Sequence, residues 1–235
     1  MAAAVTRSLV LLPGLLCDHR LWAGQLPVLE AWGDVLVPDL TRADSMAGLA
    51  GQVLARAPAR FALAGLSMGG YVALEIMRRA PERVTRLALV DTQARADGEE
   101  GKARRRGLMA LAAKGAFLGV APRLLPMFLH ADALADPQIA GTVQAMAEST
   151  GKDGFLRQQT AIMGRPDSRQ GLGAIACPTL VLAGRDDQVT PPRLQLELAA
   201  AIPDATLVLL PRCGHLAPLE RPEAVTRQLM AWLDR

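Results

Sequence analysis

Short runs of apolar residues recur along the chain, and most are continuous rather than alternating with polar residues. Continuous apolar runs of this kind are typical of strands that are buried on both faces of a parallel sheet. The first run is followed directly by Pro13-Gly14, a pair that ends a strand in a turn. Six strands are therefore predicted, over residues 8–12, 34–38, 61–66, 86–91, 178–183 and 205–210.

Segments that favour helices separate these strands. The last segment carries Val225, Leu229 and Trp232 at helical spacing, and Asp44 or Ser45 is suited to cap the second. The alternation of strands and helices predicts an α/β fold, with a parallel sheet covered by helices on both faces. The predicted helices span residues 21–31, 45–57, 71–77 and 192–200, and one begins at residue 222.

The alternation stops between the fourth and fifth strands, where only helical fragments are predicted. Asp136-Pro137 suits the start of the last fragment, as a cap followed by a first-turn proline. An ordinary helical insertion would give the same pattern, but its position favours a cap over the sheet edge. The fragments span residues 108–113, 117–129 and 139–147. The expected division is a core over residues 1–93 and 175–235 and a helical cap, or lid, over residues 94–174.

The composition limits the class of protein. The chain has 235 residues, of which 51% are hydrophobic, enough for one sizeable core. The net charge is only +3, and the one dense basic run, residues 102–106, is interpreted as a solvated helix face. Aromatic residues make up 3% of the chain, so a nucleic-acid partner, which usually requires stacking aromatics, is not expected.

The cysteines and the N-terminal residues bear on the compartment. Cys17, Cys177 and Cys213 are widely spaced and match no metal-binding pattern, so reduced thiols in a cytoplasmic protein are expected. The apolar residues 8–17 contain a Pro-Gly turn and lack a signal-peptidase site, so a secretory signal is not expected. No run approaches the length of a membrane-spanning helix, and no membrane partner is expected.

Residues 65–70, Gly-Leu-Ser-Met-Gly-Gly, connect a predicted strand to a predicted helix. Gly-x-Ser-x-Gly in that context is the pattern of a nucleophile elbow, in which a tight turn strains the backbone of the serine. Gly65 and Gly69 are expected because a Cβ at either position would collide with the turn. The hydroxyl of Ser67 then projects from the strand end, and the N–H of Met68 can donate to an oxyanion.

A serine hydroxyl is a poor nucleophile and needs a base within hydrogen-bond reach. Ligands of a parallel sheet bind beyond the carboxyl ends of the strands, where Ser67 is expected. Of the three histidines, His215 follows the last strand, His19 follows the first, and His130 lies in the helical insertion. His215 is the expected base.

A carboxylate is needed to orient the imidazole and to stabilise its protonated form. Asp187 follows the fifth strand and is favoured. Asp91, which follows the fourth strand, is the main alternative, and Asp186 is a second one. The sequence leaves the choice among these three open.

Together these features resemble the α/β-hydrolase superfamily over nearly the whole chain. The order Ser67, Asp187, His215 is the family's order of nucleophile, acid and base. The resemblance implies an α/β-hydrolase fold with a reduced, mainly parallel sheet of about six strands and a helical cap inserted after the fourth strand. The motifs that match small capped members are Gly65-x-Ser67-x-Gly69, Gly184-x-x-Asp187-x-x-x-Pro191 and Gly214-His215.

The resemblance also implies the oxyanion donors and shows two departures. The N–H groups of Met68 and Leu15 would stabilise the oxyanion, with Pro13-Gly14 in place of the family's His-Gly. Few residues precede the first predicted strand, so the family's first two strands are expected to be absent. The expected pocket lining includes Leu16, Met127, Phe128 and Leu216.

The second departure concerns the loop after the second strand, which lacks the glycines usual in the family. Arg42 in this loop could lie at the pocket mouth and favour an acidic substrate group, but a surface salt bridge is the favoured interpretation.

The expected function is hydrolysis of a small-molecule carboxylic ester through an acyl-enzyme intermediate, without a metal or an organic cofactor. The aliphatic lining indicates an apolar acyl group of modest size. The same triad serves carbon–carbon bond hydrolysis, thioester hydrolysis or acyl transfer, and cofactor-free perhydrolysis. A slow-turnover ligand receptor and a degenerate scaffold protein are alternatives from other classes. The sequence does not specify an oligomeric state.

Overall fold

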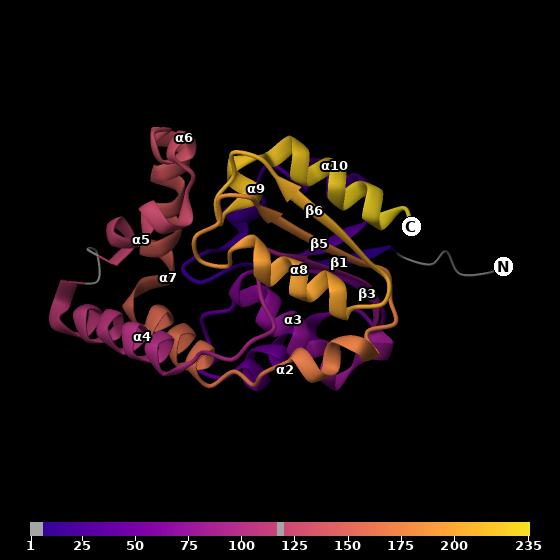
Figure 1. Ribbon diagram of the computed structural model, residues 1–235, viewed down its shortest axis with the longest axis horizontal. Helices are drawn as coiled ribbons and strands as arrows, with labels where there is room; N and C mark the ends of the chain where they lie inside the picture. The colour runs from indigo at the N-terminus through magenta and orange to yellow at the C-terminus, as the bar shows by residue number, and fades with distance from the viewer. Residues whose placement is uncertain (1–6, 117–119) are drawn as a thin grey trace.

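The computed structural model describes residues 7–116 and 120–235, and a six-stranded sheet forms its centre (Figure 1). The strand order is β2-β1-β3-β4-β5-β6, and every neighbouring pair is parallel. The prediction of a reduced parallel sheet of six strands is therefore confirmed. The strands are β1 (Ser8–Leu12), β2 (Asp34–Leu36), β3 (Phe61–Leu66), β4 (Val84–Val90), β5 (Thr179–Gly184) and β6 (Ala205–Leu210).

Helices cover both faces of the sheet. Successive strand residues alternate between two buried cores: Leu9 and Leu11 of β1 face one, and Val10 and Leu12 face the other. Figure 1 shows α3 and α10 on opposite sides of the strands. Outside the insertion the helical elements are η1 (His19–Trp22), α1 (Leu26–Trp32), α2 (Met46–Arg56), α3 (Met68–Arg79), η2 (Pro81–Arg83), α8 (Pro192–Ala201), α9 (Ala217–Glu220) and α10 (Pro222–Leu233).

Local capping explains where several helices begin. The Ser45 hydroxyl accepts the Gly48 N–H at the start of α2, so Ser45 rather than Asp44 is the cap. The single helix predicted over residues 21–31 is wrong, because the chain forms η1 and then a separate helix, α1. Pro27 lies in the first turn of α1, where its missing N–H costs nothing, whereas it would break the interior of a longer helix.

The helical insertion lies between β4 and β5, beyond one end of the sheet (Figure 1). Asp136 caps its longest helix, which is broken at Gly151 by a φ of 67°. Residues 117–119 of the fragment predicted over 117–129 lie outside the described residues. The insertion contains α4 (Glu99–Leu111), η3 (Ala112–Ala116), α5 (Val120–Phe128), α6 (Ala131–Leu134), α7 (Pro137–Met163) and η5 (Arg169–Ala174).

None of the described helices has the length and apolar character needed to cross a membrane.

Backbone strain is concentrated at the carboxyl edge of the sheet. Four described non-glycine residues have a positive φ: Leu16 (60°), Ser67 (53°), Asp91 (42°) and Arg212 (53°). Each lies in a loop that follows a strand. A non-glycine residue in this region costs about 1–3 kcal/mol and persists only where its surroundings hold it.

Glycines make the turn at Ser67 possible, although not all for the expected reason. A Cβ on Gly65 would lie 2.4 Å from the carbonyl oxygen of Gly69, so the turn itself excludes it. A Cβ on Gly69 would lie 2.3 Å from the carbonyl oxygen of Leu12. The constraint on Gly69 therefore comes from β1 and not from the turn, which corrects the explanation based on sequence.

We expect Gly69→Ala to lower the free energy of unfolding by about 2 kcal/mol or more, because backbone atoms of β1 must move to admit the methyl group. Gly107→Ala is the matched control, since Gly107 lies in α4 and a Cβ there would have no atom within 4 Å. The control should gain roughly 0.5–1 kcal/mol from helix propensity. Urea unfolding of the two variants checks this, and equal stability of Gly69→Ala and wild type would contradict it.

Candidate active site

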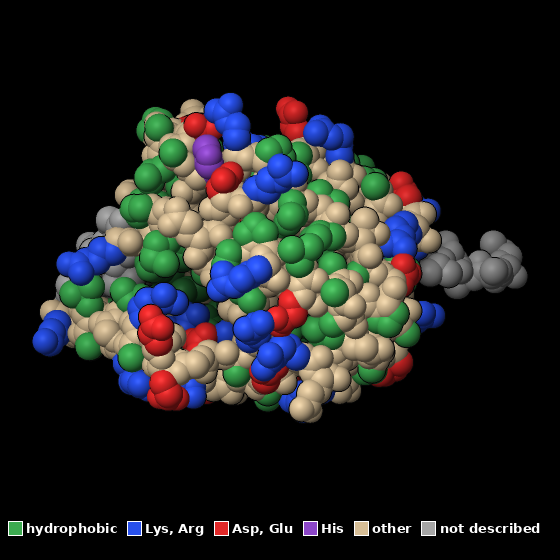
Figure 2. All heavy atoms as spheres, viewed as in Figure 1, with side chains coloured by type: hydrophobic (Ala, Val, Ile, Leu, Met, Phe, Trp, Pro, Cys, Tyr) green, Lys and Arg blue, Asp and Glu red, His purple; other side chains and the backbone are tan. Residues whose placement is uncertain are grey.

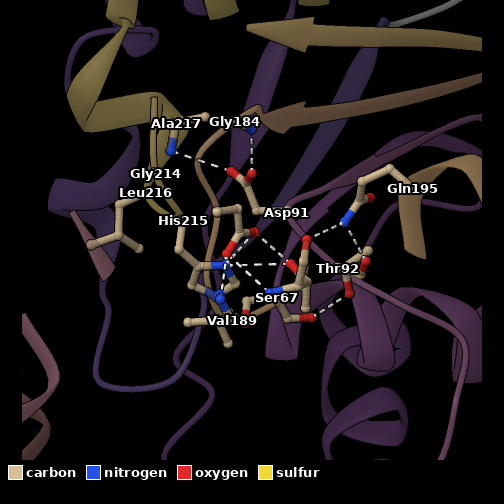
Figure 3. A network of polar contacts seen from close by, with 12 residues as sticks. Ser67, Asp91, Thr92, Gly184, Val189, Gln195, Gly214, His215, Leu216 and Ala217 are labelled. Carbon is tan, nitrogen blue, oxygen red and sulfur yellow. Dashed lines mark hydrogen bonds and ion pairs between the residues drawn. The ribbon is translucent and has the colours of Figure 1, made fainter. Parts of the chain in front are cut away.

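The loops that follow β3, β5 and β6 bring Ser67, Asp187 and His215 together (Figure 3). Ser67 Oγ lies 2.8 Å from His215 Nε2, and His215 Nδ1 lies 2.8 Å from Asp187 Oδ2. All three side chains belong to buried residues. A hydroxyl, an imidazole and a carboxylate thus form one hydrogen-bonded line at the carboxyl edge of the sheet.

The carboxylate of Asp187 is held by its own loop. The N–H groups of Val189 and Thr190 donate to Oδ1 at 2.8 and 3.0 Å, and Thr190 Oγ1 donates to Oδ2 at 2.6 Å. Burial acts to raise the pKa of Asp187, but the charge and hydrogen bond of His215 and the Thr190 donors outweigh it, so this pKa lies below its ordinary value. An ionised Asp187 favours a proton on Nδ1 of His215, which leaves Nε2 free to accept the Ser67 proton.

Asp91, the main alternative, lies close by but makes different contacts. Its carboxylate accepts the N–H of Gly184 at 2.9 Å and the N–H of Ala217 at 3.2 Å (Figure 3). Burial, followed by the negative charge of Asp187, raises the pKa of Asp91 well above its usual range. Asp91 therefore joins the end of β5 to the start of α9, while the carboxylate that contacts the imidazole is that of Asp187.

The other candidates lie away from the hydroxyl. Asp186 is half exposed, and its Oδ2 lies 3.9 Å from Nε2 of His130. His19 is exposed, and its Nδ1 lies 3.8 Å from Asp18. Of the three histidines, only His215 is hydrogen-bonded to Ser67.

Neighbouring residues hold the backbone of Ser67 in its strained conformation. Its N–H donates to the Val90 carbonyl at 2.9 Å, and its carbonyl accepts the Thr92 hydroxyl at 2.8 Å. Gln195 Nε2 donates to the carbonyls of Thr92 and Thr190, at 2.8 and 3.0 Å. This amide links the serine turn to the loop of Asp187, a role that no motif in the sequence indicates.

The two expected oxyanion donors lie on either side of Ser67. Met68 is the first residue of α3, whose N-terminus presents N–H groups that lack helical partners. Leu15 lies in the loop after β1. This loop lies against the serine, because a Cβ on Gly14 would be 3.5 Å from the Cβ of Ser67.

A side chain of the insertion fixes the loop after β1. The N–H of Leu16 donates to Oε1 of Gln158 in α7 at 3.1 Å, and Gln158 Nε2 donates to the Leu40 carbonyl at 3.3 Å. Gln158 is fully buried. The bond to Gln158 accompanies the positive φ of Leu16, the residue next to Leu15.

Glu220 is a buried carboxylate that no motif in the sequence indicates. It accepts the N–H groups of Gly214 at 3.0 Å, Leu216 at 3.1 Å and His130 at 2.9 Å. Two of these groups flank His215, and the third belongs to the insertion. The one sign of this role in the sequence is a single carboxylate among the apolar residues that follow His215.

Gly214 and His215 also contact the insertion directly. A Cβ on Gly214 would lie 2.7 Å from the backbone nitrogen of His130, which explains the glycine before the histidine. The N–H of His215 donates to the Phe128 carbonyl at 2.8 Å, and the two rings have centroids 5.7 Å apart.

A small cavity of about 60 Å³ opens beside Ser67 and His215. Leu15, Met127, Phe128 and Leu216 line it. Leu16 does not, and the expectation that it lines the pocket is wrong, because its side chain packs in the hydrophobic core. The side chain of Met68, whose N–H is an expected oxyanion donor, packs in the opposite core. The remaining lining residues are Gly14, Cys17, Leu66, Tyr71, Arg104, Arg105, Leu108, Leu124, Gln159, Ile162 and Val189.

Two basic residues of α4 lie differently from the expectation, whereas Arg42 lies as expected. Arg104 and Arg105, from the run interpreted as a solvated helix face, line this cavity. Arg42 instead pairs with Asp39 at 2.8 Å, and its side chain is 78% exposed, which confirms the surface salt bridge.

The cysteines are free thiols. Burial, followed by the charge of Asp18, raises the pKa of Cys17 to about 12, and burial likewise raises the pKa of Cys213. Both thiols are therefore protonated near neutral pH and pack as small apolar groups. Over residues 7–116 and 120–235, no group of three or more His, Cys, Asp or Glu side chains is arranged to hold a metal ion.

We expect Glu220→Ala to lower the free energy of unfolding by about 3 kcal/mol or more, because three backbone N–H groups lose their acceptor. Glu220→Gln keeps one oxygen and should lose less. Glu223→Ala is the control, since the Glu223 side chain is 92% exposed and makes only a 4.0 Å contact with Arg227. Thermal or urea unfolding of the three variants checks the order, and a Glu220→Ala variant as stable as the control would refute it.

Comparisons with known proteins show the family to which the chain is similar. Residues 9–228 match the model of the alpha/beta hydrolase family. A thermophilic esterase from Thermogutta terrifontis, solved with malate bound, has a TM-score of 0.90 and 30% identity, covering 97% of this chain and 89% of its own.

Two further relatives cover most of the chain. The enol-lactonase from Burkholderia xenovorans LB400 has a TM-score of 0.88 and 27% identity, covering 100% of this chain and 94% of its own. A Shigella flexneri protein named "Putative carbamate hydrolase RutD" is 28% identical over 239 residues, covering 94% of this chain and 89% of its own.

Proposed function

The chain belongs to the alpha/beta hydrolase family, and we propose that within it the protein is a serine hydrolase that cleaves carboxylic esters through an acyl-enzyme intermediate. The observation that carries the proposal is the hydrogen-bonded line from Ser67 Oγ through the His215 ring to Asp187, with 2.8 Å at each step. It lies at a strained turn and opens onto a cavity.

In the first half of the reaction, Ser67 Oγ attacks the ester carbonyl while His215 Nε2 takes its proton. Asp187 stabilises the imidazolium that forms, because its carboxylate is ionised and held by fixed donors. His215 then gives the proton to the departing alcohol, which leaves the acyl group on Ser67. In the second half, His215 activates a water molecule, which releases the acid and restores the hydroxyl.

The tetrahedral intermediates carry a negative oxygen. The N–H of Met68, at the N-terminus of α3, and the N–H of Leu15 are the proposed donors to it. Donors fixed in place before the reaction contribute about 3–4 kcal/mol each to barrier lowering in comparable sites. The bond between Leu16 and Gln158 supports this proposal, since it restrains the loop that carries Leu15.

The relatives support ester chemistry at a coarser level. One is called an esterase and one an enol-lactonase, and a lactone is a cyclic carboxylic ester. The name of the third relative refers to a carbamate, whose carbonyl would be attacked in the same way.

We expect Ser67→Ala to lower kcat for a short-chain p-nitrophenyl ester by about 10⁴-fold or more, because the nucleophile is lost. The variant should keep its thermal unfolding temperature. Labelling of wild type, but not of this variant, by an organophosphorus serine probe is the second readout. Full activity or full labelling of Ser67→Ala would overturn the proposed function.

Asp187→Asn and Asp91→Asn distinguish the two buried carboxylates. We expect Asp187→Asn to lower kcat by about 10³-fold or more, because the amide no longer favours the tautomer with Nε2 free. Asp91→Asn should act mainly on the free energy of unfolding, since it loses one acceptor for the N–H of Gly184 or Ala217. Kinetics and urea unfolding of both variants check this, and the reverse pattern would assign the role to Asp91.

A substrate panel separates the reactions that share this triad. The kcat/KM values for esters of increasing acyl length are compared with those for a thioester, a carbamate and a vinylogous diketone. Perhydrolysis is assayed beside them. The proposal requires the highest kcat/KM for an ester or lactone. A burst without turnover would indicate a ligand receptor instead.

A further inference from the structure

One wall of the cavity at Ser67 is basic, and it comes from the insertion. Arg104 and Arg105 of α4 and Gln159 of α7 line it. Figure 2 shows basic side chains gathered along the lower edge of a hollow beside α4, with apolar side chains inside it.

The charges at this wall do not balance. Asp97 accepts Arg105 Nε at 2.5 Å and also Arg165 Nη2 at 2.7 Å, so one carboxylate serves two guanidinium groups. Arg104 forms no ion pair with any residue in the described part of the chain. The cavity therefore has an excess of positive charge on this side, where an anion would be stabilised.

Gln159 adds an unused hydrogen-bond donor. Arg105 Nη1 lies 2.9 Å from the amide oxygen of Gln159. Arginine only donates, so this contact settles which end of the amide is oxygen and which is nitrogen. The nitrogen of Gln159 is buried, and among the described residues it has no hydrogen-bond partner. A buried donor without an acceptor is unfavourable, and a bound acceptor would remove that cost.

From the charge excess and the unused donor, we infer that this wall binds an ionised carboxylate of the substrate, which rests on the proposed ester hydrolysis. A guanidinium and an amide N–H suit the planar pair of carboxylate oxygens. The same cavity is lined by Ser67 and His215, so the substrate is an ester with a second, free carboxylate that reaches this wall. The wall recognises the carboxylate, and the apolar residues that line the cavity hold the carbon chain.

The test compares two esters that differ only at the proposed contact. Monomethyl succinate carries a carboxylate, and methyl succinamate carries a neutral amide of the same size. We expect the ratio of their kcat/KM values, acid over amide, to be about 10 or more in the wild type, since a charge-assisted hydrogen bond typically gives about 10- to 100-fold.

Two variants remove the contact in different ways. Gln159→Glu is isosteric, keeps an acceptor for Arg105 and replaces the donor by a negative oxygen, so the ratio should fall about tenfold or more. Arg104→Gln removes the unpaired cation from an exposed position, where folding is least affected, and should also lower the ratio. Thermal unfolding verifies that each variant is folded. If Gln159→Glu does not fold, Arg104→Gln alone tests the contact.

Arg106→Gln is the matched control. Arg106 lies on the same helix, is 57% exposed, contacts Glu99 at 3.8 Å and does not line the cavity. It removes the same charge, so it reports any general electrostatic steering of the anionic ester. The ratio should stay at the wild-type value.

Any of three outcomes would overturn the carboxylate site. The first is a wild-type ratio near one, and the second is a ratio that stays at the wild-type value in the folded variants at Gln159 and Arg104. The third is a fall of the ratio in Arg106→Gln as large as in those variants. In each of these cases, Ser67-dependent hydrolysis of methyl succinamate would leave the proposed function standing. Hydrolysis that persists in Ser67→Ala would overturn the proposed function itself.

Discussion

The structure depends on how closely the backbone packs at one turn. β3 ends at Leu66 and α3 begins at Met68, so Ser67 alone connects a buried strand to a helix. That residue must take a φ of 53°, and the helix must start against the carbonyl of Leu12. Only glycine at positions 65 and 69 permits both approaches. The Ser67 hydroxyl is presented at the end of β3 because the bonds of its backbone to Val90 and Thr92 hold this strained conformation.

Buried carboxylates turn the neighbouring loops into a rigid frame. Asp187, Asp91 and Glu220 together accept seven hydrogen bonds from backbone N–H groups. Asp187 and Asp91 accept two each, and Glu220 accepts three. Most of these N–H groups belong to the loops after β5 and β6, which have no regular structure to satisfy them. The pKa shifts of Asp187 and Asp91 run in opposite directions, so the negative charge is favoured beside the imidazole.

The insertion belongs to this frame and also lines the cavity. Its backbone accepts the N–H of His215, its His130 N–H binds Glu220, and its Gln158 holds the loop of Leu15. The same helices supply the basic wall of the cavity. Movement of the insertion would therefore alter both the shape of the cavity and the placement of the groups around Ser67.

The sequence by itself determined the features that depend on neighbours along the chain. The six strands, the sharp turn at Ser67 and the helix cap at Asp136 follow from apolar runs, glycine spacing and capping residues, which act within a few residues. Only the tertiary structure decided which aspartate contacts His215, why Gly69 is required, and that Glu220 and Arg104 face other elements. These outcomes depend on distance and burial between residues far apart in the chain, and no local pattern encodes either quantity.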